Sequence, residues 1–224
     1  MVALDDYSVI HGILRQPSLV DYPGQLGVLM FTSGCNFRCP YCHNKEIVNH
    51  EAKLRMASAT FLAWLESRKG KLDGVCITGG EPTLHGQLDF LIWEIKRRGF
   101  LVKLDTNGYL PLKISRRADY IAMDIKNSPS KYAVTAGVDP ETFDFQKIEE
   151  SVRYIMRFAK DYEFRTTVTR SMHTAEDFKE IGKLINGARR YFLQKCTTDE
   201  PDAEDMQRYK KIIESYVDSV EIRG

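Results

Sequence analysis

Three of the five cysteines lie within eight residues, as Cys35, Cys39 and Cys42, in the spacing C-x-x-x-C-x-x-C. An apolar run, Leu26 to Phe31, leads directly into this loop and is typical of a strand buried on both faces. Three thiolates from one short loop can hold an iron–sulfur cluster, because soft sulfur ligands suit iron. A four-iron cluster ordinarily takes four cysteines. A loop with three therefore predicts a cluster in which one iron stays open to another ligand.

Zinc is the main alternative occupant of the cysteine loop. A closed structural zinc site takes four ligands, usually as two separated pairs. His43 could be the fourth ligand, but it directly follows Cys42, where the ligand geometry would be strained. The odd number of cysteines argues against a disulfide framework and for a reducing compartment. A non-catalytic metal-binding or electron-transfer module is the alternative from a different functional class.

The composition limits the size and the surroundings of the protein. The chain has 224 residues, 43% of them hydrophobic and 28% charged, which suffices for one buried core and a charged surface. The formal net charge of +1 implies no general attraction to nucleic acid or to membranes. The sequence has no pattern of a membrane span or a signal peptide, so we expect a cytoplasmic protein. We expect residues 1–224 to form a single domain.

Short apolar runs alternate with segments of helical periodicity along the chain. Such alternation is typical of parallel strands joined by crossover helices. Eight strand–helix units need about 250 residues, so we expect an α/β fold in the form of a partial barrel. Predicted strands cover residues 27–31, 74–78, 101–104, 120–123, 162–169, 191–193 and 220–222, and predicted helices cover residues 57–68, 88–98, 145–159, 174–185 and 203–217.

Local signals add details to this pattern. Ser58 is the predicted N-cap of the first helix, and Thr174 with Asp177 three residues later resembles a capping box. The segment from Ser128 to Pro140 is predicted to be the most mobile loop. We expect residues 1–25 to form an N-terminal extension that packs on the barrel, and residues 203–224 to form a C-terminal helix and short strand.

Polar motifs come after the predicted strands rather than before them. The cysteine loop follows the first strand and Gly79-Gly80-Glu81 follows the second, while Asp105-Thr106-Asn107-Gly108 and Asp124-Ile125-Lys126 follow the next two. In a parallel α/β barrel the carboxyl ends of the strands meet on one face, where active sites are built. We therefore expect these separate motifs to form one site.

The cysteine spacing together with Gly79-Gly80-Glu81-Pro82-Thr83 resembles the radical S-adenosylmethionine (SAM) superfamily. This resemblance implies a six-stranded partial (β/α)6 barrel. It also implies one [4Fe-4S] cluster on Cys35, Cys39 and Cys42, with SAM chelating the open iron through its amino and carboxylate groups. The reduced cluster would cleave SAM to methionine and a 5′-deoxyadenosyl radical.

Two further segments, Ser18 to Gly24 and Cys42-His43-Asn44, resemble the activating enzymes of glycyl-radical proteins. Within that group the resemblance is to the family that activates anaerobic ribonucleoside-triphosphate reductase. It implies that reductase as the partner and a flavodoxin or ferredoxin-type electron donor. Some similar enzymes carry an inserted ferredoxin-like module after the cysteine loop. Residues 43–75 contain no cysteine, so we expect a single cluster.

The resemblance also implies which residues contact SAM near the cysteine loop. The backbone of Tyr41 would contact the adenine, with Cys42 and His43 beside it. Alternatively, the Tyr41 ring packs beside the cluster and shields it from water. Gly79-Gly80-Glu81 would bind the methionine amino group, because two glycines expose backbone to a close ligand. The alternative is a tight turn that places Glu81 near a helix start.

The later motifs have weaker signals. Asp105, Thr106 and Asn107 would reach the sugar and methionine portions of SAM, or they form only a turn. The resemblance implies a SAM contact here, in which either Lys126 would bind the SAM carboxylate or Asp124 would assist at the glycine-binding side. Alternatively, the two residues form only an ion pair at a strand end.

Three remaining residues have no motif around them. His173 follows the fifth predicted strand and is a candidate neighbour of the ligand, although a lone loop histidine is more often at the surface. Cys76 lies inside an apolar strand and is predicted to be a small buried hydrophobe. Cys196 ends the sixth predicted strand and is predicted to be inert.

The sequence leaves two functional alternatives open beside the activase of anaerobic ribonucleotide reductase. One is the activase of a different glycyl-radical enzyme. The other is a small radical SAM enzyme that acts on a small molecule, such as a deazapurine synthase. We see no added domain that would cover a small substrate, so we expect a barrel mouth that is open to a protein loop.

Overall fold

The computed structural model describes residues 10–49 and 56–223. Its eight strands follow one another in chain order, from β1 to β8. The chain divides into two compact units, and the division falls inside β5 (Tyr120–Asp124). The first unit contains the chain up to Asn36 with Asn44–Thr106 and Lys113–Ile121, and the second contains Phe37–His43, Asn107–Leu112 and the chain from Ala122 on.

The first unit is built on four strands. β1 (Ile10–Ser18) pairs antiparallel with β2 (Gly27–Thr32), and β2, β3 (Gly74–Gly79) and β4 (Leu101–Thr106) pair in parallel. β3 is apolar along most of its length and is buried on both faces, as expected for a strand covered on both sides. The turn between β1 and β2 includes Gly24, whose φ of +71° suits glycine.

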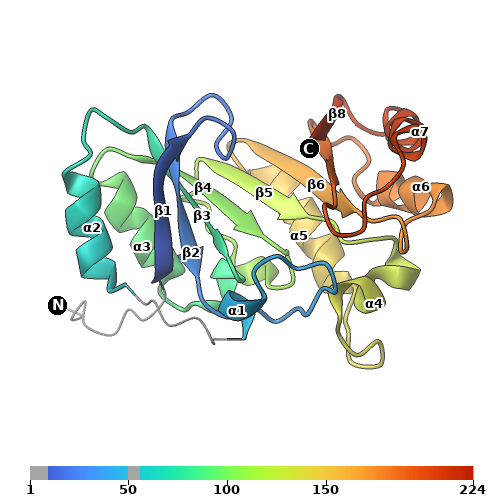
Figure 1. Cartoon of the computed structure of the whole chain (residues 1–224), viewed down its shortest axis with the longest axis horizontal. Helices are drawn as coiled ribbons and strands as arrows, with labels where there is room; N and C mark the ends of the chain where they lie inside the picture. Colours follow the sequence, from blue (N-terminus) through green and yellow to red (C-terminus); the bar gives the residue numbers. More distant parts are fainter. Residues whose placement is uncertain (1–9, 50–55, 224) are drawn as a thin grey trace. The chain divides into compact units, whose positions relative to one another are not determined.

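Helices of the first unit cover these strands. α2 (Ser58–Glu66) and α3 (Leu88–Lys96) lie side by side (Figure 1), and each buries one apolar face. Two short helices flank the polar motifs, α1 (Lys45–Val48) after the cysteine loop and η2 (Pro82–Leu84) after β3. The N-cap of α2 is Ala57 rather than Ser58, so the predicted cap was wrong by one residue and no side chain caps this helix.

The second unit continues with parallel strands. β6 (Tyr162–Val168), β7 (Tyr191–Lys195) and β8 (Val220–Arg223) pair in parallel, with α5 (Gln146–Phe158), α6 (Ala175–Leu184) and α7 (Ala203–Ile213) between or beside them. The predicted capping box at Thr174 and Asp177 is confirmed. Glu163 on β6 is fully buried, and its carboxylate accepts hydrogen bonds from both terminal nitrogens of Arg223 on β8, at 3.0 and 3.1 Å. This pair ties the last strand to the sheet.

Most sequence predictions of the fold are confirmed. The parallel α/β class, the order of the elements and the C-terminal helix and strand all hold. Residues 1–9 of the predicted N-terminal extension lie outside the described residues, and β1 follows them. Within the part of the chain that the structure describes, no helix is both long and apolar enough to cross a membrane. The prediction of a single domain stays a prediction.

Two further predictions of local structure, besides the N-cap of α2, were wrong. The segment from Ser128 to Pro140 is not an irregular loop, because it contains η4 (Pro129–Lys131) and α4 (Tyr132–Ala136), and the Tyr132 side chain is fully buried. The β4 and β5 strands are also longer than predicted. Asp105 and Thr106 belong to β4 and Asp124 belongs to β5, so these residues are strand ends rather than loop residues. A further short helix, η3 (Pro111–Lys113), follows β4.

Candidate functional site

In the first unit, the residues that lead into Cys35 are held by backbone hydrogen bonds. The N–H of Gly34 donates to the carbonyl of Ile47 in α1, at 3.0 Å. The N–H of Gly80 donates to Thr32 O at 2.9 Å, and that of Glu81 donates to Gly34 O at 2.8 Å. The Gly-Gly-Glu motif therefore lies directly against the backbone that precedes Cys35, as its position after β3 predicts.

The two glycines of this motif are required by that close approach. Gly79 has a φ of +104°, a region that glycine adopts without strain. A Cβ atom on Gly80 would lie 1.9 Å from Gly34 O, which no side chain could tolerate. Backbone packing therefore explains both glycines, in agreement with the tight-turn alternative. The predicted contact of this motif with the SAM amino group stays a prediction.

Glu81 lies inside a hydrogen-bond network of the first unit. Its side chain is 1% exposed, and Oε1 accepts bonds from Thr83 N at 3.0 Å, Thr83 Oγ1 at 2.6 Å and Thr106 Oγ1 at 2.8 Å. The bond from Thr83 N caps η2. Asp105, one residue earlier in β4, accepts a bond at 2.6 Å from the buried Lys103 ammonium, which the sequence analysis missed. The two motifs are thus joined by buried polar contacts.

The part of the cysteine loop that belongs to the second unit, Phe37–His43, packs against α4. Arg38 N donates to Ala136 O at 2.8 Å, and Cys39 Sγ lies 3.8 Å from the same oxygen. Gly137 follows α4 with a φ of +66°, and a Cβ on it would lie 2.1 Å from Arg38 O. Cys42 N donates to Cys39 O at 3.0 Å, which forms a turn between these two cysteines. This turn makes the second half of the loop compact.

The Lys126 cation acts on the pKa of two side chains in this loop, Cys39 and Tyr41. Burial raises the pKa of the Cys39 thiol, and the nearby Lys126 cation acts in the opposite direction. Burial likewise raises the pKa of Tyr41, against the pull of Lys126. The Tyr41 hydroxyl is buried and has no hydrogen-bond partner among the described residues. A buried phenol of this kind is open to a bond from a ligand.

Asp124, Lys126 and Arg165 form a charged cluster in the second unit. Lys126 Nζ lies 2.9 Å from Asp124 Oδ2, and Arg165 Nε pairs with Asp124 Oδ1. Burial alone would raise the pKa of Asp124, but the Arg165 and Lys126 cations outweigh it and hold that pKa well below its usual range. Burial lowers the pKa of Lys126, but the Asp124 carboxylate outweighs it and the net shift is upward. Both groups are therefore charged at neutral pH.

Two residues that contact Asp124, Arg165 and Tyr132, were not predicted from the sequence. Arg165 is the one cation of β6, where it follows Phe164 and precedes Thr166, and a cation inside a predicted strand is the signal that could have identified it. Tyr132 OH donates to Asp124 O at 3.2 Å, and only the tertiary structure brings α4 to the end of β5. The predicted ion-pair alternative for Asp124 and Lys126 is confirmed, while their contacts with SAM stay predictions.

The remaining candidates of the second unit are placed as follows. His173 is 3% exposed, so it is not a surface residue, and both of its ring nitrogens have protein partners. Asn107 Oδ1 accepts a bond from Tyr109 N at 3.0 Å and forms a turn. His43 is exposed, with Nε2 3.2 Å from Thr197 Oγ1.

The cysteines are suited to an iron–sulfur cluster by their chemistry. None of the five forms a disulfide, and Cys35, Cys39 and Cys42 are partly exposed. Cys76 is buried as predicted, and Cys196 is buried as well. No three His, Cys, Asp or Glu side chains within residues 10–49 and 56–223 converge as they would around a single metal ion. Each thiolate of a four-iron cluster binds a different iron, so a cluster does not require that convergence.

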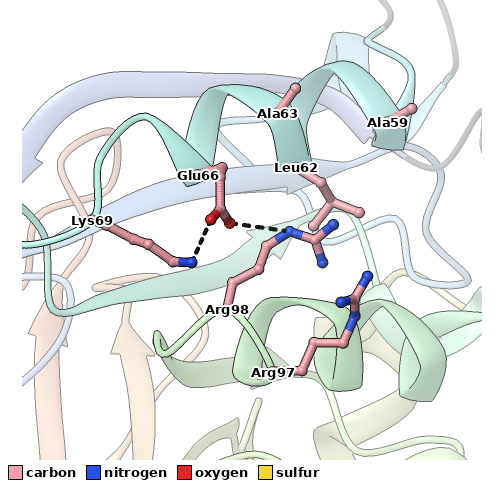
Figure 2. A pocket seen from close by; sticks show the side chains of 7 residues that line it. All are labelled: Ala59, Leu62, Ala63, Glu66, Lys69, Arg97 and Arg98. Carbon is pink, nitrogen blue, oxygen red and sulfur yellow. Dashed lines mark hydrogen bonds and ion pairs between the residues drawn. The ribbon is translucent and has the colours of Figure 1, made fainter.

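A surface pocket of about 420 Å³ lies between α2 and α3 of the first unit (Figure 2). Glu66 pairs there with Lys69, and its second oxygen lies 3.7 Å from Arg98 Nε. Cations near helix C-termini are favoured by the helix dipole, so these charges have a structural explanation. None of the predicted site residues lines this pocket.

Comparisons with known proteins point to one family. Residues 29–186 match the family described as the Radical SAM superfamily. A protein of Methanocaldococcus jannaschii named "Putative glycyl-radical enzyme activating enzyme MJ1227" is 31% identical, over 92% of both chains. The pyruvate formate-lyase-activating enzyme of Streptococcus mutans is 28% identical, over 83% of this chain and 76% of its own.

Other relatives have a different activity. The 7-carboxy-7-deazaguanine synthase of Methanopyrus kandleri is 28% identical, over 72% of this chain and 81% of its own. Among solved structures, QueE from Escherichia coli is similar with a TM-score of 0.61 and 16% identity, over 96% of this chain and 93% of its own. At that identity the likeness concerns the fold alone, and it confirms the predicted fold class.

Proposed function

Because this chain belongs to the radical SAM superfamily, whose members use a [4Fe-4S] cluster and S-adenosylmethionine, we propose that it activates a glycyl-radical enzyme. The observation that carries the proposal is the 31% identity to a relative named as such an activating enzyme, over 92% of both chains. The chain is an enzyme of the radical SAM type. The proposed partner is an anaerobic ribonucleoside-triphosphate reductase, on the resemblance of Ser18 to Gly24 and Cys42-His43-Asn44.

We assign the cluster to Cys35, Cys39 and Cys42. Their partial exposure and their spacing within one loop support this assignment. When bound by these three cysteines, the reduced cluster would supply the electron for the cleavage of SAM, and this chemistry would provide the means to remove a hydrogen atom from a glycine of the partner. The electron comes from a flavodoxin or ferredoxin-type donor. The protein's own part is to hold the cofactor, orient SAM and exclude water.

We assign three of the sequence motifs to SAM. The Lys126 ammonium binds the SAM carboxylate, and Asp124 and Arg165 support it, since this network keeps the lysine charged and in place. The backbone around Gly79-Gly80-Glu81 binds the amino group, while the Glu81 carboxylate organises the turn through the hydrogen bonds that it accepts from Thr83 and Thr106. Tyr41 contacts the cofactor through its backbone, and its buried hydroxyl is available as a donor.

An anaerobic assay tests the function. The reduced, reconstituted protein is incubated with SAM and the anaerobic reductase, and the glycyl radical is followed by electron paramagnetic resonance. We expect a glycyl doublet, and oxygen-induced cleavage of the reductase at that glycine. The Cys39→Ala variant is the control and should give neither signal. A fully active preparation that cleaves SAM but leaves every glycyl-radical enzyme unmodified would contradict the proposal.

A second candidate function rests on the deazaguanine synthase relative, at 28% identity over 72% of this chain. That enzyme class acts on a small molecule. The same preparation is therefore supplied with a small purine precursor in place of the reductase. Rapid product formation without any glycyl radical would favour the synthase.

A further inference from the structure

The protonation state of His173 follows from its partners. The backbone N–H of Thr169 donates to Nδ1 at 3.1 Å, so Nδ1 carries no proton. Nε2 therefore carries the proton and donates it to the backbone oxygen of Lys126, at 3.0 Å. Burial lowers the pKa of this histidine, in agreement with a neutral ring. Both ring nitrogens of His173 are engaged in hydrogen bonds within the protein, so neither is available to bind a cofactor.

The backbone that follows Lys126 is anchored to the same region. Asn127 Nδ2 donates to Thr135 Oγ1 at 3.0 Å and to Met172 O at 3.1 Å. Ser128 Oγ donates to Asp177 Oδ1 at 2.7 Å, at the N-terminus of α6. The turn from Lys126 to Ser128 is thus attached to the segment between β6 and α6. His173 holds the end of that turn that carries the lysine.

The His173 ring is itself held from the other side. It packs against Phe178 of α6, with ring centroids 5.8 Å apart, and Phe178 stacks on Tyr209 of α7 at 4.3 Å. Tyr209 OH donates to the backbone oxygen of His173, at 3.3 Å. Two helices therefore support the ring and through it the Lys126 carbonyl.

Lys126 needs this support because its side chain is long and flexible. Its ammonium pairs with Asp124, and Cys39 and Tyr41 lie within its electrostatic reach. A lysine is a point charge on four rotatable carbons, so the position of its charge depends on how its backbone is held. A shift of the Lys126 peptide would move the ammonium away from its target.

We propose that His173 is a positioning residue, which holds the Lys126 peptide so that the Lys126 ammonium meets the SAM carboxylate. The proposal rests on the role of Lys126 in the proposed function. His173 touches neither SAM nor the cluster and acts through Lys126 alone. It therefore determines affinity for SAM and not the content of the cluster.

The test compares His173→Phe with His173→Gln in the reconstituted holoenzyme. SAM affinity is measured from the change that SAM produces in the paramagnetic spectrum of the reduced cluster. His173→Phe removes the donor and should weaken SAM binding about tenfold, the loss expected for one hydrogen bond that holds a charged group in place. His173→Gln keeps an amide N–H that can reach the Lys126 carbonyl, and should restore most of the affinity. Iron content should be the same in both variants.

A double-mutant cycle separates this role from the others. Lys126→Met removes the ammonium, and adding His173→Phe to it should cause no further loss if His173 acts only through Lys126. A further loss in the double variant would show direct contact with SAM and overturn the proposal. The proposal would also be overturned if His173→Phe bound SAM with unchanged affinity while Lys126→Met bound SAM weakly. An unchanged affinity in Lys126→Met would instead contradict the role given to Lys126 in the proposed function.

A stability control excludes a general effect of unfolding. Ile155→Val shortens a fully buried side chain on α5 that takes no part in this network. It should lower the thermal midpoint yet leave SAM affinity unchanged. Equal losses of SAM affinity in Ile155→Val and His173→Phe would show a merely structural effect and overturn the proposal.

Discussion

The Thr106 hydroxyl donates a hydrogen bond to Oε1 of Glu81, 2.8 Å away. This bond joins the end of β4 to the Gly-Gly-Glu turn after β3, across 25 positions of the chain. Both side chains are buried. Two motifs that are far apart in the sequence are therefore joined by a hydrogen bond. A substitution in one motif is expected to disturb the structure of the other.

Thr106→Val tests this link. The variant keeps the shape of the side chain but removes the hydrogen bond that the buried Glu81 carboxylate accepts from Thr106. We expect unfolding to become easier by about 1–3 kcal/mol, the cost of an unsatisfied buried acceptor. Thermal denaturation measures it, and Thr142→Val, at an exposed hydroxyl, is the matched control. Equal midpoints for Thr106→Val and wild type would show that the bond contributes nothing.

Gly80→Ala is expected to impair the cluster as well as SAM binding. The new Cβ would lie 1.9 Å from the carbonyl of Gly34, the residue before Cys35, so the loop must move. Overpacking of this kind costs about 1–3 kcal/mol, and iron content after reconstitution should fall. Gly86→Ala is the control, since a Cβ there meets nothing within 4 Å. A Gly80→Ala protein with full iron content would show that the loop accommodates the methyl group.

Each cysteine of the loop is expected to be essential for the cluster. Replacing Cys35, Cys39 or Cys42 by Ala removes one of three thiolate ligands, so the oxygen-labile four-iron chromophore should be lost. Iron and sulfide analysis with visible absorption measures it. The buried residues Cys76 and Cys196 provide controls, and their Ala variants should keep the cluster. A colourless protein that binds zinc at full occupancy would instead favour the zinc alternative.

Asp124→Asn is expected to destabilise the protein in a pH-dependent manner. The Arg165 and Lys126 cations outweigh burial and lower the pKa of Asp124 in the folded state, whereas an unfolded Asp has a pKa of about 3.9. Its stabilising contribution is therefore fully present above that pKa and is lost as the pH falls towards the folded-state value. The variant should be less stable by about 3 kcal/mol at pH 7, because two cations lose their partner.

Urea unfolding of cluster-free protein between pH 3 and pH 7 measures this difference. The gap between wild type and Asp124→Asn should narrow below about pH 4. Asp139→Asn provides the control, because Asp139 is an exposed carboxylate that only accepts a backbone bond from Glu141. A gap that stays constant down to pH 3 would mean that the charge of Asp124 has no role in stability.

The accuracy of the sequence predictions differed between local signals and strand ends. The capping box of Thr174 and Asp177 is confirmed because its two residues are three positions apart and need no other part of the chain. The strand ends were less accurate, since Asp105, Thr106 and Asp124 extend strands beyond their apolar runs. Such polar residues can end a strand because partners on other elements compensate their burial, and periodicity does not report those partners.

By itself the sequence determined the cysteine spacing, the order of strands and helices and the place of each polar motif at the carboxyl end of a strand. These features depend on neighbouring residues and on hydrophobic periodicity. Only the tertiary structure decided what each polar side chain contacts. Arg165 reaches Asp124 across 41 positions, and His173 reaches Lys126 across 47. The physical reason is that the protonation and the hydrogen bonds of a buried charge or ring depend on the donors and acceptors around it. The packing of the strands brings those donors and acceptors together.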